Sequence, residues 1–282
     1  LSGPFSCPNR DGSIGTGGCL FCSEKASGEF AGDRQDSLKT QFEQGKALLH
    51  QKWKDAKYIA YFQANTNTYA PLPILQALFE EAILLDPNIV AISIATRPDC
   101  LPLEVLEYLA LLNQKIPVWI ELGLQTIHES TRRAMHIGYP LSTFEEAVWA
   151  LHERGIAVIA HIINGFPQET KEDMLETARV LNRYPLQGVK IHSLYITRDS
   201  DIGKLYNEHP FPLLSLEEYV EIVACQLSLL NPDFVIHRIN GDPPLKTLIA
   251  PKWATKKFIV MNEIDKYMRK NQLYQGSKKV NS

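Results

Sequence analysis

The sequence predicts an α/β fold, a partial (β/α)6 barrel of the TIM type followed by an α-rich C-terminal extension. Short apolar segments alternate with helical segments between residues 57 and 195, and polar residues gather directly after the apolar segments. The carboxyl ends of the strands form one face of a β/α barrel, where functional residues collect. An open doubly wound sheet also satisfies the alternation, but no G-x-G-x-x-G follows a strand, as a dinucleotide-binding sheet would show.

The expected strands are short, mostly apolar runs, several of them rich in β-branched residues. A helical segment lies between successive runs, and this repeat gives parallel strands with right-handed crossovers. The strands are expected at Tyr58–Gln63, Ile89–Ala95, Pro117–Leu122, Ala157–Ile163 and Gly188–Tyr195. The helices are expected at Ile74–Leu85, Leu103–Asn113, Thr143–Arg154 and Lys171–Arg183.

Capping boxes mark the start of three helices, because a hydroxyl and a carboxylate three residues later satisfy free amides of the first turn. They are Ser142 with Glu145, Thr170 with Asp173, and Ser215 with Glu218. The repeat fades after residue 199, so we expect a barrel over residues 1–201 and an extension over 202–282 that packs on it. The extension is expected to hold helices at Leu216–Leu230 and Met261–Asn271 and a strand at Phe234–Ile239.

The composition is that of a globular protein, since 282 residues with 45% hydrophobic residues suffice for a sizeable core. No apolar run reaches the roughly 18 residues of a membrane helix, and no signal peptide is recognisable, although the first residue is Leu1 and not Met. Five cysteines, three of them near the N-terminus, are not typical of a secreted disulfide framework. We therefore expect a cytoplasmic protein with a metal site and no membrane partner.

Three cysteines form the strongest chemical motif. Eleven residues separate Cys7 from Cys19, which with Cys22 forms a C-x2-C turn that brings two thiolates to one metal site. A four-iron cube normally uses four cysteines, so three leave one iron open to a further ligand. The alternative is a structural zinc site with a fourth ligand such as His50, although no second ligand pair follows. The glycines between the cysteines are not a phosphate loop, because no Gly-Lys-Ser/Thr follows them.

The segment CPNRDGSIGTGGCLFC at residues 7–22 resembles the cluster motif of a bacterial radical S-adenosylmethionine (SAM) family. That family is related to the Elongator catalytic subunit and to oxygen-independent coproporphyrinogen oxidase. The resemblance covers nearly the whole chain. It includes YFQANTNTY at 61–69, TRPD at 96–99, ELGLQT at 121–126, GFP at 165–167 and HRI at 237–239.

The resemblance implies a [4Fe–4S] cluster on the three cysteines, with SAM chelating the open iron. It also implies reductive cleavage of SAM to a 5′-deoxyadenosyl radical, with a small electron donor such as flavodoxin or ferredoxin. The implied SAM contacts are Gln63, Ala64, Asn65 and Thr66 for the amino group, Gln125 and His161 for the ribose, Tyr195, Ile196 and Phe21 at the adenine, and Thr96.

One position departs from the family pattern. Related enzymes usually place an Arg that pairs with the SAM carboxylate twelve residues after the equivalent of Gln125, and here that residue is Ile137. Arg133 or His136, within the preceding turn, is the candidate substitute.

Glu121, Lys190 and His192 are the candidate catalytic residues. Glu121 is expected to face the barrel interior, either as a substrate or SAM contact or in a salt bridge with Arg97 or Lys190. Lys190 and His192 alternate along one strand face, and pointing inward each needs a partner or a task. Cys100 and Cys225 lack partners at ligand spacing, and Trp53, Trp119, Trp149 and Trp253 are expected in the core or at interfaces.

The charge distribution bears on the partner. The net charge is −3, but the chain from residue 250 onward carries +6. In it, Lys252, Trp253, Lys256, Lys257 and Phe258 form a candidate RNA surface, although an ordinary amphipathic segment explains them equally well.

The family resemblance implies tRNA as the partner and the C5 side chain of its wobble uridine as the substrate. The expected reaction leads from a carboxymethylaminomethyl group towards aminomethyluridine. The alternatives are a radical enzyme with a small-molecule substrate and a non-catalytic, cluster-binding regulatory protein.

Overall fold

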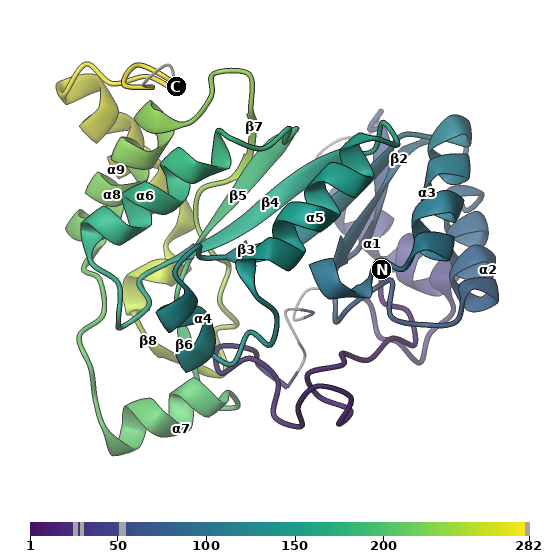
Figure 1. Cartoon of the computed structure of the whole chain (residues 1–282), viewed down its shortest axis with the longest axis horizontal. Helices are drawn as coiled ribbons and strands as arrows, with labels where there is room; N and C mark the ends of the chain where they lie inside the picture. Colours follow the sequence, from purple (N-terminus) through teal and green to yellow (C-terminus); the bar gives the residue numbers. More distant parts are fainter. Residues whose placement is uncertain (25–27, 29–30, 51–54, 280–282) are drawn as a thin grey trace. The chain divides into compact units, whose positions relative to one another are not determined.

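The structure is a computed structural model that describes residues 1–24, 28, 31–50 and 55–279. Trp53 and the side chain of His50 lie outside the described residues. The chain divides into two compact units (Figure 1). Unit 1 comprises residues 1–16, 25–123 and 143–158, and unit 2 comprises residues 17–24, 124–142 and 159–282. No helix of the described residues is long and apolar enough to span a membrane.

Unit 1 contains parallel strands backed by helices. Strand β1 pairs with β2, and β2 pairs with β3, both in parallel. The strands are β1 (Tyr58–Phe62), β2 (Ile89–Thr96) and β3 (Val118–Gln125), whose last two residues belong to unit 2. The helices are α1 (Leu38–His50), α2 (Leu72–Ile83), α3 (Leu103–Lys115), the 3-10 turn Pro98–Cys100 and α5 (Leu141–His152), whose first two residues belong to unit 2. Fully buried Phe62, Phe79 and Ile92 belong to the core under these helices.

Unit 2 contains the remaining strands. Strand β4 (Ala157–Asn164), whose first two residues belong to unit 1, pairs with β5 (Gly188–Ser193), and β5 pairs with β7 (Val235–Arg238), again in parallel. The six parallel strands follow the order β1-β2-β3-β4-β5-β7. A separate antiparallel pair joins β6 (Ile196–Thr197) to β8 (Leu248–Ala250).

The helices of unit 2 lie in two groups. Helix α6 (Lys171–Leu181) packs on α8 (Leu216–Leu229), and α8 packs on α9 (Lys257–Lys270), as Figure 1 shows. The shorter helices are α4 (Glu129–Ala134), α7 (Asp201–Glu208) and the 3-10 turn Lys252–Thr255. Strand β7 belongs to the segment after residue 201, so that segment supplies an edge strand of the parallel sheet as well as helices.

Most of the predicted elements form, and the capping boxes at Thr170 and Ser215 are confirmed in full. The box predicted at Ser142 is wrong. Helix α5 begins at Leu141, two residues before its expected start at Thr143, and the Glu129 carboxylate accepts the Leu141 N–H at 2.7 Å, so a distant side chain binds the first amide of the helix. The strand expected to reach Tyr195 ends at Ser193, and helix α9 begins at Lys257, four residues before its predicted start.

Candidate functional site

The first cluster cysteine lies in a tight loop of unit 1. The Cys7 carbonyl accepts the N–H groups of Arg10 and Asp11 at 2.8 and 3.1 Å, and the Pro8 carbonyl accepts the N–H of Ile14 at 2.8 Å. Gly12 has φ +96°, a conformation that favours glycine over other residues. The backbone of the glycine-rich loop thus folds on itself and leaves the Cys7 thiol half-buried and free of a disulfide.

The other two cysteines lie in a turn of unit 2 that is anchored on a buried core. The Cys22 N–H donates to the Cys19 carbonyl at 2.9 Å, which closes the C-x2-C turn. Leu20 between them donates its N–H to Met135 O at 3.1 Å and accepts the N–H of Ile202 at 2.9 Å. The Phe21 ring lies 5.6 Å from that of Phe166, centroid to centroid.

The donor set fits an iron–sulfur cluster. None of the three cysteines is in a disulfide, and each is half-buried. Among the described residues, no group of three or more His, Cys, Asp or Glu side chains could hold a single metal ion. The cysteines of an iron–sulfur cube bind different iron atoms, so they need not meet around one ion.

The segment after β1 is held by backbone and amide contacts within unit 1. Thr66 donates its N–H to Ser6 O at 3.2 Å, one residue before Cys7. Asn65 has φ +62°, which Asn tolerates better than most residues. Thr68 and Thr96 share a hydroxyl hydrogen bond of 2.6 Å, which ties this segment to the end of β2. The sequence of unit 1 therefore brings the predicted SAM-amino segment next to the residues that lead into the cluster loop.

Glu121 is a buried carboxylate with hydroxyl donors. It is 3% exposed and accepts the Tyr61 hydroxyl at 2.8 Å and the Ser93 hydroxyl at 2.7 Å. Arg97, one of the two ion-pair partners considered for it, forms a two-pronged pair with Asp99 at 2.9 and 2.8 Å. Hydrogen bonding to the charged form compensates part of the cost of burying this carboxylate.

A polar row crosses two strands of unit 2. His161 of β4 lies in register with Lys190 of β5, and Ile163 lies in register with His192. Residues two apart on a strand share a face, so these four side chains project from the same face of the sheet. The two imidazole rings lie 5.3 Å apart. On the opposite face, Ile162 and Ile191 are buried.

Gln125 stands at the end of β3 in an unusual turn. Its φ is +69°, and the Thr126 N–H donates to Leu124 O at 2.9 Å across it. Arg132 of α4 is 1% exposed and donates to both Leu124 O and Thr126 O, at 2.9 and 2.8 Å. Sequence reasoning missed Arg132, because only the fold brings its side chain to these carbonyls.

The position of the family Arg is a core position in this chain. Ile137 is completely buried in a cluster with Met135, Phe166 and Ile196, and Cys19 and Phe21 pack against the same cluster. Its two proposed substitutes, Arg133 and His136, are exposed. Ile137 therefore supports the cysteine turn through packing.

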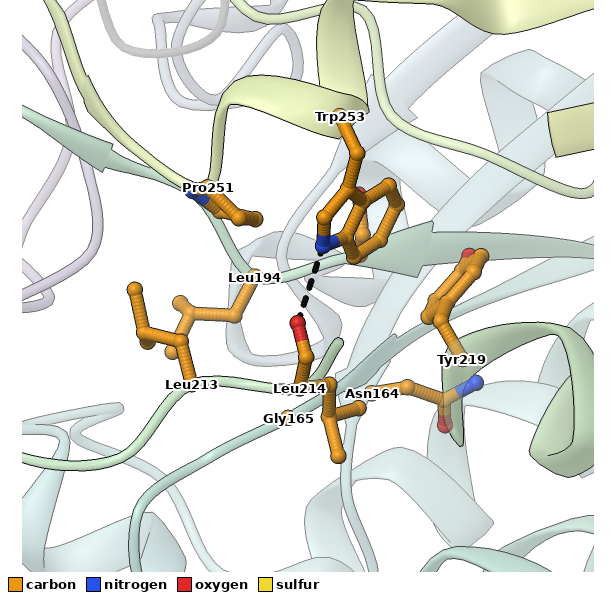
Figure 2. Close-up of a pocket in the computed structure, with 9 residues that line it drawn as sticks. Asn164, Gly165, Leu194, Leu213, Leu214, Tyr219, Pro251 and Trp253 are labelled. Carbon is orange, nitrogen blue, oxygen red and sulfur yellow. Dashed lines mark hydrogen bonds between the residues drawn. The ribbon is translucent and has the colours of Figure 1, made fainter. Parts of the chain in front are cut away.

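The segment after β5 lines a small pocket within unit 2 (Figure 2). Tyr195 is half-buried, and Ile196 is completely buried and pairs with Ala250 of β8. The pocket is lined by Asn164, Gly165, Ser193, Leu194, Leu213, Leu214, Tyr219, Pro251 and Trp253. Figure 2 shows the Trp253 indole N–H pointing to Leu214 O, which it reaches at 2.9 Å.

Trp253, which the candidate RNA surface included, is half-buried and packs within unit 2, in line with the expectation of a core or interface position. Its ring lies 4.9 Å from that of Tyr219 and its N–H is used inside the protein. Phe258 remains accessible, at 78% exposure, and Lys252, Lys256 and Lys257 are exposed beside it in sequence. Lys257 pairs with Asp242 at 3.1 Å, so part of the positive charge is compensated. Trp149, expected in the core or at an interface, is 47% exposed on α5.

Comparison with known proteins identifies the family. The profile described as the Radical SAM superfamily matches residues 11–181, and that of the Radical_SAM C-terminal domain matches residues 186–270. The uncharacterized protein YtqA of Bacillus subtilis is 46% identical over 98% of this chain and 85% of its own length. Elongator complex protein 3 of Homo sapiens is 24% identical over 55% of this chain and 28% of its own length.

The fold agrees with this assignment. The structure of archaeal Elp3 from Methanocaldococcus infernus superposes with a TM-score of 0.69 at 19% identity, over 84% of this chain and 59% of that protein. This similarity confirms the predicted fold class, a partial β/α barrel. The chain belongs to the radical SAM superfamily, whose cofactors are a [4Fe–4S] cluster and SAM.

Proposed function

We propose that Cys7, Cys19 and Cys22 hold the [4Fe–4S] cluster of a radical SAM enzyme. The observation that carries the proposal is the anchored cysteine turn, in which Leu20 is hydrogen-bonded on both sides and Phe21 packs on Phe166. The half-buried, disulfide-free thiols provide the three thiolates that leave one iron of a cube open. When bound, the cluster supplies the electron that cleaves SAM to methionine and a 5′-deoxyadenosyl radical.

The SAM contacts follow the strand ends. In unit 1, residues 63–66 would bind the amino group, and the hydrogen bond between Thr66 and Ser6 holds this segment against the approach to Cys7. In unit 2, Gln125 and His161 would bind the ribose, and Phe21, Tyr195 and Ile196 would form the adenine site. The chain has Ile137 at the position of the Arg that pairs with the SAM carboxylate in related enzymes, and the exposed Arg133 is the proposed replacement.

The remaining polar residues would act on substrate. Glu121 is held by two hydroxyl donors, so its orientation is fixed before any ligand arrives. Lys190 and His192 project from the same strand face as His161. Their proposed role is to position the substrate and to hold or transfer a proton beside the radical site.

We propose tRNA as the substrate, with the C5 side chain of the wobble uridine as the reacting group. The proposed reaction takes carboxymethylaminomethyluridine towards aminomethyluridine. Similarity to Elongator complex protein 3 and the exposed Lys252, Lys256, Lys257 and Phe258 support this choice. Lysines near the phosphates would supply salt-dependent affinity, and the exposed Phe258 ring could stack on a base. A small-molecule substrate and a purely regulatory role are the alternatives.

Two measurements test the enzyme and the substrate separately. The protein purified without oxygen should contain about four irons per chain and should release 5′-deoxyadenosine from SAM with a reductant. A colourless protein with one zinc per chain contradicts the cluster. Mass spectrometry of tRNA nucleosides from a deletion strain tests the substrate, and an unchanged wobble-uridine profile would exclude tRNA.

Removal of positive charge from the surface tests the RNA contact. The triple change of Lys252, Lys256 and Lys257 to Ala should weaken tRNA binding and reduce its salt dependence, with the cluster and SAM cleavage retained. The matched control removes three exposed lysines elsewhere, Lys39, Lys115 and Lys204, with the same change in net charge. Equal loss of tRNA affinity in both variants would show that net charge, and not this surface, governs binding.

A further inference from the structure

Gln125 occupies a strained turn at the end of β3. Its φ of +69° and the 2.9 Å bond from Thr126 N–H to Leu124 O define a three-residue turn with a left-handed central residue. Such turns are rare and strained for residues other than glycine. A strained conformation persists only where the surrounding structure imposes it.

Arg132 supplies that constraint. Its guanidinium donates to Leu124 O at 2.9 Å and to Thr126 O at 2.8 Å, so one group binds the carbonyls on both sides of Gln125. A third bond, to Tyr139 O at 2.8 Å, fixes the guanidinium to the chain beyond α4. Arg132 is 1% exposed, and a guanidinium buried with this many acceptors is rigid.

The turn leaves the Gln125 side chain available. Leu124 and Thr126 are completely buried, whereas Gln125 is half-buried. Within the described part of the chain, no hydrogen bond to the Gln125 carboxamide is present. The buried Arg132 contacts therefore hold the backbone around a polar side chain that receives no hydrogen bond from the residues that the structure describes.

We propose that Arg132 is a positioning residue that holds Gln125 in its strained turn so that the carboxamide meets the ribose hydroxyls of SAM. The inference rests on the proposed SAM site, in which Gln125 is a ribose contact. The alternative is that Arg132 only braces α4 and that the turn has no role in binding.

The strain is tested by glycine substitution in the cluster-free protein. Gln125→Gly should raise the thermal midpoint by roughly 1–3 °C, because glycine adopts a positive φ without strain. Gln272 is the matched control: it is also a glutamine, has φ +54°, and is exposed after helix α9. Gln272→Gly should raise the midpoint similarly. A fall in midpoint for Gln125→Gly alone would overturn the claim of strain.

SAM binding to the cluster-loaded protein tests whether the Gln125 carboxamide contacts SAM. Gln125→Gly and Gln125→Ala should each weaken SAM roughly tenfold, as expected for one lost hydrogen bond to ligand, whereas Gln272→Gly should not. Stability and affinity would then move in opposite directions for Gln125→Gly. Unchanged SAM affinity in both Gln125 variants would overturn the contact.

A double-mutant cycle tests whether Arg132 affects SAM binding through Gln125 or only stabilises the fold. Arg132→Lys keeps the charge but lacks the planar guanidinium, whose Nη1 donates to both carbonyls while its Nη2 donates to Tyr139 O. If Arg132 acts through Gln125, Arg132→Lys should weaken SAM binding roughly tenfold in the wild-type background and should have little effect on it in the Gln125→Ala background. The same loss in both backgrounds would show that Arg132 only braces the fold. Failure of the wild-type, cluster-loaded protein to bind SAM would instead refute the proposed function.

Discussion

The packing of Ile137 under the cysteine turn gives the sharpest prediction. This side chain is completely buried among Met135, Phe166 and Ile196, and Cys19 packs on the same cluster. Ile137→Val should cost about 1 kcal/mol and Ile137→Ala about 3–4 kcal/mol of unfolding free energy, since the cavity adds to the lost transfer energy. Ile137→Arg, which introduces the family residue, should cost at least about 3–5 kcal/mol, because it buries a charge among apolar groups.

The assay has two parts. Denaturant unfolding of the cluster-free protein, followed by circular dichroism, measures the free energies. Loss of iron to a chelator from the reconstituted protein measures how firmly the cysteine turn is held, and Ile137→Ala should lose iron faster than wild type. Ile191→Ala is the matched control, because Ile191 is also completely buried in unit 2 but lies outside the cluster that contacts Cys19.

The two alanine variants should differ in iron retention but not in stability. Ile191→Ala should destabilise the fold by a similar amount while leaving the rate of iron loss close to that of wild type. Equal iron loss in the two variants would mean that global stability controls cluster retention. An Ile137→Arg protein of normal stability that binds SAM more tightly would refute the core assignment and place residue 137 in the SAM site.

Three further outcomes are expected. Cys22→Ala should abolish the cluster, whereas Cys225→Ala should retain about four irons per chain by iron analysis. Burial raises the pKa of the Glu169 carboxyl above its ordinary value of 4.5, so the folded state favours the protonated form. The free energy of unfolding is therefore higher at low pH and decreases as the pH rises through the raised pKa. Glu169→Gln should remove this decrease in unfolding free energy. In denaturant titrations, the stability of the variant relative to wild type should therefore increase with pH above 4.5. Gln226→Leu should cost about 1–3 kcal/mol by denaturant unfolding, because Asn164 loses its buried partner; a double Asn164→Leu, Gln226→Leu change that costs the full sum of the single changes would contradict the pairing.

Local patterns predicted the elements that depend on local interactions. The strands at residues 58–62 and 89–96 follow from apolar, β-branched runs, and the capping boxes at Thr170 and Ser215 follow from contacts three residues apart. The box at Ser142 failed because helix α5 begins at Leu141, which places Ser142 inside the first turn, and the Leu141 N–H donates to Glu129, twelve residues earlier. A rule that considers only neighbouring residues does not include this contact.

The charge pattern predicted the exposed surface less well than the hydrophobic pattern predicted the strands and helices. Lys252, Lys256 and Lys257 are exposed as expected, but Trp253 between them turns inward to Leu214 and Tyr219. Its indole N–H needs an acceptor once it is half-buried, and the carbonyl of Leu214, 39 residues away, provides one. Proximity in sequence to the lysines therefore did not make it part of their surface.

The sequence by itself determined the superfamily, the cysteine set and the alternation of strands and helices, because spacing and periodicity are properties of neighbouring residues. Tertiary structure decided which distant groups meet. It set His161 in register with Lys190, buried Ile137 beneath the cysteine turn, and placed Arg132 on the carbonyls that flank Gln125. These contacts depend on strand register and on the route of the chain between elements, which a one-residue shift would change without altering any motif.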